Sequence, residues 1–180
     1  MMKKIIIIIL LVWCSPVIAQ IKSATLTASG LTCSMCSKAI YKALLNVPFI
    51  KSVNADVERS SYALTFKEGE QVILDDVKKA VQGAGFSVAS MQVTAAFDNM
   101  EVYNDAHIKL GGSTLHFLNV PKQVLNGDKT FTILDKNYLS SGERKKFRKF
   151  TKMECFETGM MGSCCPGGKS AANRVYHVTM

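Results

Sequence analysis

Residues 22–95 alternate between strand and helix signals, and this order constrains the fold more than any other feature. Apolar residues that alternate with polar ones predict three strands, at 24–29, 53–57 and 62–66. Apolar residues spaced three and four apart predict two helices, one from Cys36 and one from Leu74. A last strand begins near Phe86. The order is that of the ferredoxin-like βαββαβ arrangement, an α+β fold.

Two cysteines, Cys33 and Cys36, lie between the first strand and the first helix, in the run Gly-Leu-Thr-Cys-Ser-Met-Cys. Cys36 falls in the first helical turn, where backbone N–H groups and the helix dipole stabilise a thiolate. Two soft thiolates suit Cu(I) or Hg(II), whereas Zn(II) prefers four ligands. We therefore expect a metal site at Cys33 and Cys36, with Cu(I) foremost and Hg(II) or Zn(II) as alternatives.

With this motif, residues 22–95 resemble the heavy-metal-associated domain. That domain occurs in copper chaperones, at the N-termini of metal-transporting P-type ATPases and in the periplasmic mercury-binding protein. The resemblance rests on the cysteine motif, the hairpin and the run Gly83-Ala84-Gly85-Phe86. It implies capture or transfer of Cu(I) by ligand exchange with a donor or acceptor protein. Family members that select zinc tend to carry an acidic residue where this chain has Thr32, which favours copper.

The same cysteine pair supports a second interpretation, an envelope protein that exchanges thiols and disulfides. A redox-active Cys-x-x-Cys motif also opens a helix. However, Ser34 and Met35 stand between the cysteines here, where thioredoxin-type motifs usually have Gly-Pro. A disulfide formed passively between Cys33 and Cys36 after export is a further alternative.

The first residues have the pattern of a secretory signal peptide. Lys3 and Lys4 precede an apolar run, and Val17-Ile18-Ala19 suits a cleavage site before Gln20. The run is shorter than the roughly 20 residues that a spanning helix needs. We predict that residues 1–19 are removed and that the protein is periplasmic or secreted, without stable membrane insertion.

The formal net charge of +8 raises the question of a nucleic-acid partner. The densest basic run, residues 144–149, is interpreted as the solvated face of a helix. An exported chain without a nucleic-acid recognition motif is not expected to bind nucleic acid. The predicted partner is a protein that gives or takes the metal.

Residues 96–180 are predicted to form a small, mostly-β domain with one helix and a loop rich in cysteine and methionine. Short strands are expected at 108–110, 115–120, 131–134 and 173–180. Gly111-Gly112 should form the turn between the first two. A Ser-to-Glu capping pattern predicts a helix from Ser140 to about Phe150.

The loop offers a possible second soft-metal site, formed by Cys155, Cys164, Cys165, Met160 and Met161. The alternative is a disulfide from Cys155 to Cys164 or Cys165, since small exported domains use such links. The two interpretations can coexist. Loss of Cys14 with the signal peptide leaves an odd number of cysteines, so not all can pair within the chain.

No catalytic constellation stands out in the sequence. No motif pairs a nucleophile with a base, cradles a phosphate or sets two acids at a telling spacing. His107, His116 and His177 are far apart along the chain, and each alone is more often structural than a ligand. We therefore expect a metal-binding protein that is not an enzyme.

Overall fold

The computed structural model describes residues 20–31, 34–166 and 173–180. The predicted signal peptide, residues 1–19, lies outside these ranges, as do Thr32 and Cys33. Among the described residues, no helix has both the length and the apolar character needed to cross a membrane.

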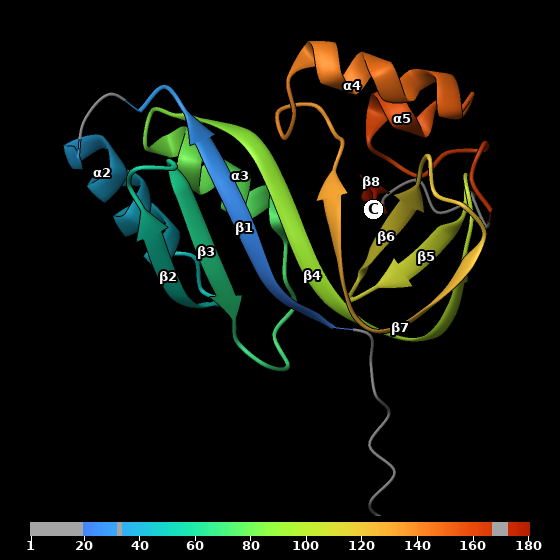
Figure 1. The fold of residues 1–180 in the computed structure, drawn as a ribbon, viewed down its shortest axis with the longest axis horizontal. Helices are drawn as coiled ribbons and strands as arrows, with labels where there is room; N and C mark the ends of the chain where they lie inside the picture. Colours follow the sequence, from blue (N-terminus) through green and yellow to red (C-terminus); the bar gives the residue numbers. More distant parts are fainter. Residues whose placement is uncertain (1–19, 32–33, 167–172) are drawn as a thin grey trace, which may run out of the picture.

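Eight strands in the described ranges form one sheet, in the order β2-β3-β1-β4-β7-β8-β6-β5 (Figure 1). The strands are β1 (Ile21–Ser29), β2 (Ile50–Asp56), β3 (Ser61–Phe66), β4 (Ser87–Val102), β5 (His107–Leu110), β6 (Ser113–Phe117), β7 (Gln123–Ile133) and β8 (Val175–Thr179). The helices are α2 (Ser34–Leu45), α3 (Leu74–Gly83), α4 (Ser141–Phe147) and α5 (Cys155–Thr158), with a 3-10 turn, η2 (Arg148–Phe150). Paired strands are antiparallel except for β6 and β8, which run parallel.

The first half of the sheet confirms the predicted ferredoxin-like order. Strand, helix, hairpin, helix and strand follow one another, and β1 lies between β3 and β4. The two helices present apolar faces to the sheet, as their spacing predicts. Their fully buried residues are Ile40 and Leu44 of α2 and Leu74, Val77 and Val81 of α3.

Strand β4 joins the two halves of the sheet. It pairs with β1 on one edge, from Ala95 back to Ser87, and with β7 on the other, from Gln92 to Val102. A bulge between Phe97 and Met100 interrupts the pairing with β7. The expected boundary between residues 95 and 96 therefore falls inside one strand, and the sheet is continuous there.

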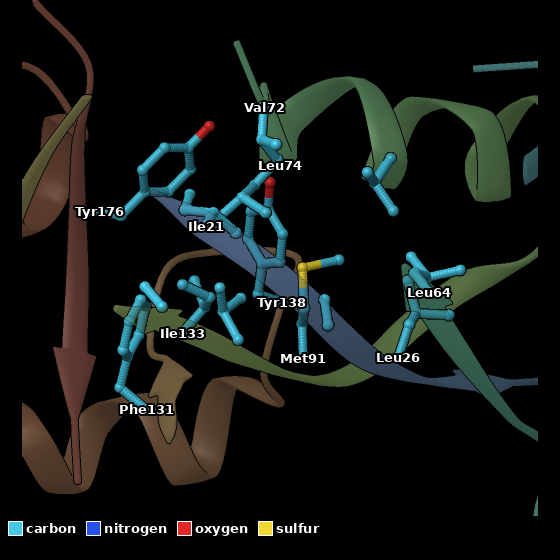
Figure 2. Close-up of a cluster of buried hydrophobic side chains, with 14 of the residues drawn as sticks. Ile21, Leu26, Leu64, Val72, Leu74, Met91, Phe131, Ile133, Tyr138 and Tyr176 are labelled. Carbon is cyan, nitrogen blue, oxygen red and sulfur yellow. The ribbon is translucent and has the colours of Figure 1, made fainter. Parts of the chain in front are cut away.

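The hydrophobic core is also continuous across the two halves (Figure 2). Leu26, Leu64 and Met91 from the first half are fully buried. Phe131 and Tyr176 from the second half belong to the same cluster. Burial of apolar side chains stabilises by about 25 cal/mol per Å², so this shared cluster holds the two halves against each other.

The second half matches the predicted elements in part. The Gly111-Gly112 turn links β5 to β6, and Ser140 caps α4, its Oγ accepting a hydrogen bond from the Glu143 amide at 3.3 Å. Strand β7 begins eight residues before the predicted start, at Gln123, because it pairs with β4 along that length. The expectation of one helix is wrong, since α5 forms within the cysteine-rich loop, where burial of Cys155 and Phe156 anchors it.

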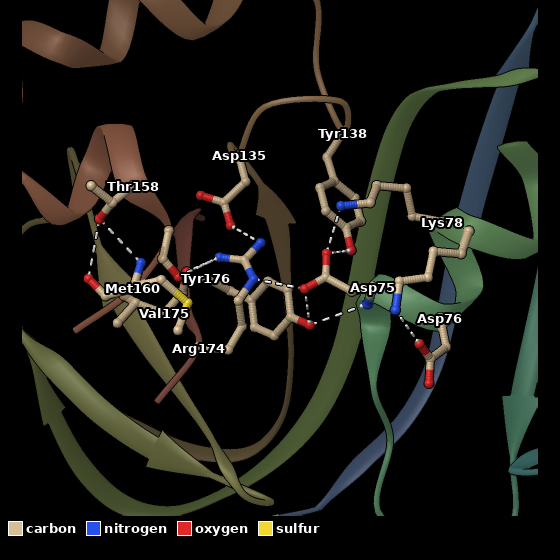
Figure 3. A network of polar contacts seen from close by, with 12 residues as sticks. Asp75, Asp76, Lys78, Asp135, Tyr138, Thr158, Met160, Arg174, Val175 and Tyr176 are labelled. Carbon is tan, nitrogen blue, oxygen red and sulfur yellow. Dashed lines mark hydrogen bonds and ion pairs between the residues drawn. The ribbon is translucent and has the colours of Figure 1, made fainter. Parts of the chain in front are cut away.

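A polar network ties α3 to the second half (Figure 3). Asp75, in the first turn of α3, accepts hydrogen bonds from Arg174 Nε at 2.7 Å and from Tyr138 Oη at 2.9 Å. Lys78 also donates to Asp75 at 2.6 Å. Arg174 reaches on to Asp135, with Nη2 2.8 Å from Oδ2. Although burial raises the pKa of the Asp75 carboxyl, hydrogen bonds from Arg174 and Lys78 hold it well below its usual range.

We predict that Asp75→Asn lowers the free energy of unfolding by about 2 kcal/mol at neutral pH, because it leaves the partly buried Arg174 and Lys78 without their shared anion. Asp76→Asn is the matched control. Asp76 is partly exposed, and among the described residues its carboxylate pairs with the exposed Lys79 alone, so its loss should cost no more than about 0.5 kcal/mol.

The difference in stability between the wild type and Asp75→Asn should decrease as the pH falls. Because the pKa of Asp75 is depressed in the folded protein, its contribution is fully present above the unfolded value of about 4 and is lost as the pH falls below it. Urea denaturation of the wild type and of Asp75→Asn should therefore give curves that converge in acid. A difference that persists unchanged at about pH 2 would contradict this role of the carboxylate.

Candidate metal centres

The first turn of α2 is held against β3. Tyr62 is fully buried, and its hydroxyl lies 3.0 Å from Ser37 Oγ. The same hydroxyl donates to the Ser37 carbonyl at 3.4 Å. Cys36, one residue earlier, is half-buried, and Met35 is 80% exposed. The helix start that carries Cys36 is thus fixed by a buried polar contact rather than by apolar packing alone.

The chain enters this turn through Gly30, whose φ of +84° is in the left-handed region that favours glycine. Leu31, next in the chain, packs against the core. Phe86 is also partly buried against the core. Because Cys33 lies outside the described residues, the paired site of Cys33 and Cys36 stays a prediction.

Three cysteines of the second half form a cluster. The sulfurs of Cys155, Cys164 and Cys165 all lie within 4.8 Å of one another. Cys155 and Cys165 are buried, and Cys164 is half-buried. All three are separate thiols in the structure, without the alternative disulfide from Cys155 to Cys164 or Cys165. The sulfurs of the neighbouring Cys164 and Cys165 are also unbonded, at 3.7 Å. A disulfide would need about 2.05 Å.

The two methionines of the predicted second site have different places. Met161 is buried in one small cluster with Cys155 and Cys165, and Thr114 Oγ1 donates to its sulfur at 3.7 Å. Met160 is 37% exposed and lines a surface pocket of about 400 Å³ instead. The structure thus gathers the three cysteines with Met161 and leaves Met160 apart.

Three histidines that seem isolated in the sequence lie side by side in the sheet. His107 of β5 pairs with His116 of β6, and His116 pairs with His177 of β8. The His107 and His116 rings stack with centroids 4.1 Å apart, and the His116 and His177 centroids are 4.9 Å apart. The interpretation of these residues as isolated is therefore wrong, because strand register brings them together.

Each histidine has one ring nitrogen held by an oxygen. Asp105 serves two of them, with its carbonyl 3.0 Å from His107 Nδ1 and its Oδ1 2.9 Å from His116 Nε2. His177 Nδ1 lies 2.6 Å from Asp135 Oδ1. The opposite nitrogens of His107 and His177, both Nε2, are buried without a hydrogen-bond partner in the described structure. Such orphaned buried nitrogens are uncommon and call for an explanation.

Cys155 connects the histidines to the cysteines. Its sulfur lies 3.6 Å from His116 Nδ1. One nitrogen each of His107 and His116 and the Cys155 sulfur all lie within 4.8 Å of one another. Burial, with help from His107 and His177, lowers the pKa of His116 to about 4, so its imidazole is neutral at physiological pH. Burial also raises the pKa of the Cys155 thiol.

The sequence held one signal for this cluster. His107 and His116 are equally distant from the Gly111-Gly112 turn, so a two-residue hairpin places them opposite each other. The pairing of His116 with His177 had no such signal, because β6 and β8 are parallel and distant along the chain.

Comparison with known proteins places the first half in one family. The heavy-metal-associated domain family matches residues 25–87. The mercuric transport protein periplasmic component of Serratia marcescens is 31% identical over 72 residues, which are 40% of this chain and 78% of that protein.

Solved structures align over a similar share of the chain. The oxidised MerP from Ralstonia metallidurans CH34 is 28% identical and covers 38% of this chain and 96% of its own, with a TM-score of 0.34. The CopZ metallochaperone is 22% identical and covers 37% of this chain and 98% of its own, with a TM-score of 0.35.

We predict that Tyr62→Phe loosens the first turn of α2. Loss of the Tyr62–Ser37 hydrogen bond should cost about 1 kcal/mol of stability and leave Ser37 Oγ buried without this partner. Hydrogen exchange should accelerate at the amides of the first turns of α2 more than at those of α3. Tyr103→Phe, at a side chain that is 49% exposed, is the control and should change neither. Equal exchange in all three proteins would contradict the proposed anchoring.

Proposed function

The chain belongs to the heavy-metal-associated domain family, and we propose that it captures or hands over Cu(I) through Cys33 and Cys36. The observation that carries the proposal is the place of Cys36, at the start of a helix whose first turn is fixed by Tyr62 and Ser37. Both cysteines fall within the matched residues 25–87.

The chemistry of the pair supports a transfer role. The thiolate is the form of cysteine that binds metal. Two thiolates complete a low-coordinate shell around a soft ion and leave room for a third ligand from another protein. Ligand exchange with a donor or acceptor protein then moves the ion without releasing it into water. The half-exposed position of Cys36 suits such an approach.

Export is part of the proposal. Lys3 and Lys4, the apolar run after them and Val17-Ile18-Ala19 support a signal peptide, and the relative from Serratia marcescens is named as a periplasmic component. In an oxidising compartment, the cysteine pair must be kept reduced or be loaded with metal early. A bound soft ion would itself protect the two sulfurs from oxidation.

Hg(II) is the second candidate cargo, because that same relative is named as a mercuric transport protein. Hg(II) shares the preference for two thiolates with Cu(I). The two cargoes differ in redox behaviour, since Cu(I) must be held against oxidation to Cu(II), whose preferred ligands are nitrogen and oxygen.

A competition experiment tests the proposal. The reduced protein is titrated with Cu(I), and separately with Hg(II), against a chromophoric chelator, beside Cys33→Ser/Cys36→Ser. We expect the wild type to take a tightly held Cu(I) that the double variant lacks. Ser34→Ala, between the two cysteines but without a thiol, is the matched control and should bind as the wild type does.

Three results would contradict the proposal. Equal uptake of Cu(I) by the double variant would show that Cys33 and Cys36 do not bind the ion. Tight Hg(II) binding with weak Cu(I) binding would favour the mercury cargo instead. Disulfide reductase activity without affinity for either ion would favour a redox protein.

A further inference from the structure

Two groups of metal-binding atoms meet at Cys155, apart from the site of the proposed function. One group has two imidazoles and a thiol, from His107, His116 and Cys155, and the other has the thiols of Cys155, Cys164 and Cys165. Together they offer five donors, the buried Cys155 sulfur and four others around it. Helices α2 and α5, which carry Cys36 and Cys155, lie towards opposite ends of the long axis of the molecule (Figure 1).

The distances between neighbouring donor atoms match the edges of a tetrahedral shell. Bonds of about 2.3 Å from zinc to sulfur and about 2.0 Å to nitrogen place tetrahedral ligands roughly 3.5 to 3.8 Å apart. The Cys164 and Cys165 sulfurs are 3.7 Å apart, and Cys155 Sγ is 3.6 Å from His116 Nδ1. These distances are long for strong hydrogen bonds and fit two ligands of a single ion.

The imidazoles are oriented as metal ligands usually are. A ligating histidine commonly gives its other ring nitrogen to a carboxylate or carbonyl oxygen, which fixes the ring. Asp105 does this for both His107 and His116. Its φ of +69° is uncommon for a residue other than glycine. An unusual backbone conformation is thus held at the one residue that orients two candidate ligands.

Burial gives the cluster a reason to hold an ion. His116 and Cys155 are almost completely buried, and the Nε2 atom of His107 is buried without a partner. Buried polar atoms in proteins are normally satisfied, and an ion among these donors would satisfy several at once.

We propose that this cluster is a second metal site, a closed tetrahedral site for Zn(II). Cys155 and His116 are two of its ligands, and two of Cys164, Cys165 and His107 complete the shell. Zn(II) prefers a four-coordinate shell with mixed imidazole and thiolate ligands. A shell that contains only sulfur ligands favours Cu(I) instead.

The ion would fasten a segment with little regular secondary structure to the sheet. Between Thr151 and Pro166 the only described helix is α5, with four residues. Its small apolar cluster consists mainly of sulfur-containing side chains. A shell that joins Cys155 and Cys164 or Cys165 to a histidine of β5 or β6 links this segment to two strands. The free energy of binding then contributes to folding.

The experiment uses the Cys33→Ser/Cys36→Ser protein, so that the first site cannot contribute. After reduction and loading with Zn(II), the protein is freed of excess ion, its zinc content is measured, and the zinc X-ray absorption fine structure is recorded. We expect one tightly held Zn(II) per chain, with sulfur at about 2.3 Å and nitrogen at about 2.0 Å in the same shell. We also expect a higher melting temperature than that of the metal-free protein.

The ratio of sulfur to nitrogen identifies the remaining ligands. Three sulfurs to one nitrogen would assign Cys164 and Cys165, and two to two would assign His107 with one of them. No retained zinc, or a shell of sulfur alone, would overturn the proposal. None of these results depends on whether Cys33 and Cys36 carry Cu(I), because both are replaced.

Variants localise the ion. Cys155→Ser in the same background should abolish retention of zinc and the gain in melting temperature. Met160→Leu is the matched control, because Met160 belongs to the same loop but lies apart from the cluster, and it should retain the ion. Full retention by Cys155→Ser would place the zinc elsewhere and overturn the proposal. The absorption spectrum of the parent protein tests the site even if Cys155→Ser does not fold.

Discussion

The pairing of β4 on both of its edges is the constraint on which the rest of the structure depends. One edge completes the ferredoxin-like half through β1, and the other starts the second half through β7. Backbone hydrogen bonds along a strand leave no freedom for one half to rotate against the other, and the shared core and the Asp75–Arg174 pair add to this rigidity. The two candidate metal centres are therefore held in one framework.

The first half could be predicted from its sequence because its contacts are local or follow simple periods. The helices from Ser34 and Leu74 show clear three- and four-residue spacing, and the hairpin is closed by a short polar turn. The sequence of the second half contains fewer such signals. Only the last part of β7 carries a strand signal, and the rest of it forms because β4 supplies a partner.

The cluster of His107, His116 and His177 shows which contacts the sequence can predict and which it cannot. The pairing of His107 with His116 follows from counting outward from Gly111-Gly112, so it was available in principle. The contact of His116 with His177 and that of Cys155 with His116 depend on a parallel crossover and on a loop folding back over the sheet. No local pattern encodes such contacts. For the same reason, the sequence could not decide between a disulfide of Cys155 and a cluster of the three thiols of Cys155, Cys164 and Cys165.

The two proposed metal centres differ in their chemistry. A pair of thiolates beside a half-exposed helix start favours rapid exchange of a soft ion, whereas a buried set of four donors favours retention. The measurement that tests this account most directly is native mass spectrometry of the reduced protein after exposure to Cu(I) and Zn(II) together. The account predicts a dominant species with one Cu(I) and one Zn(II), from which a chelator for Cu(I) removes only the copper. A protein that holds either ion only at the expense of the other would contradict it.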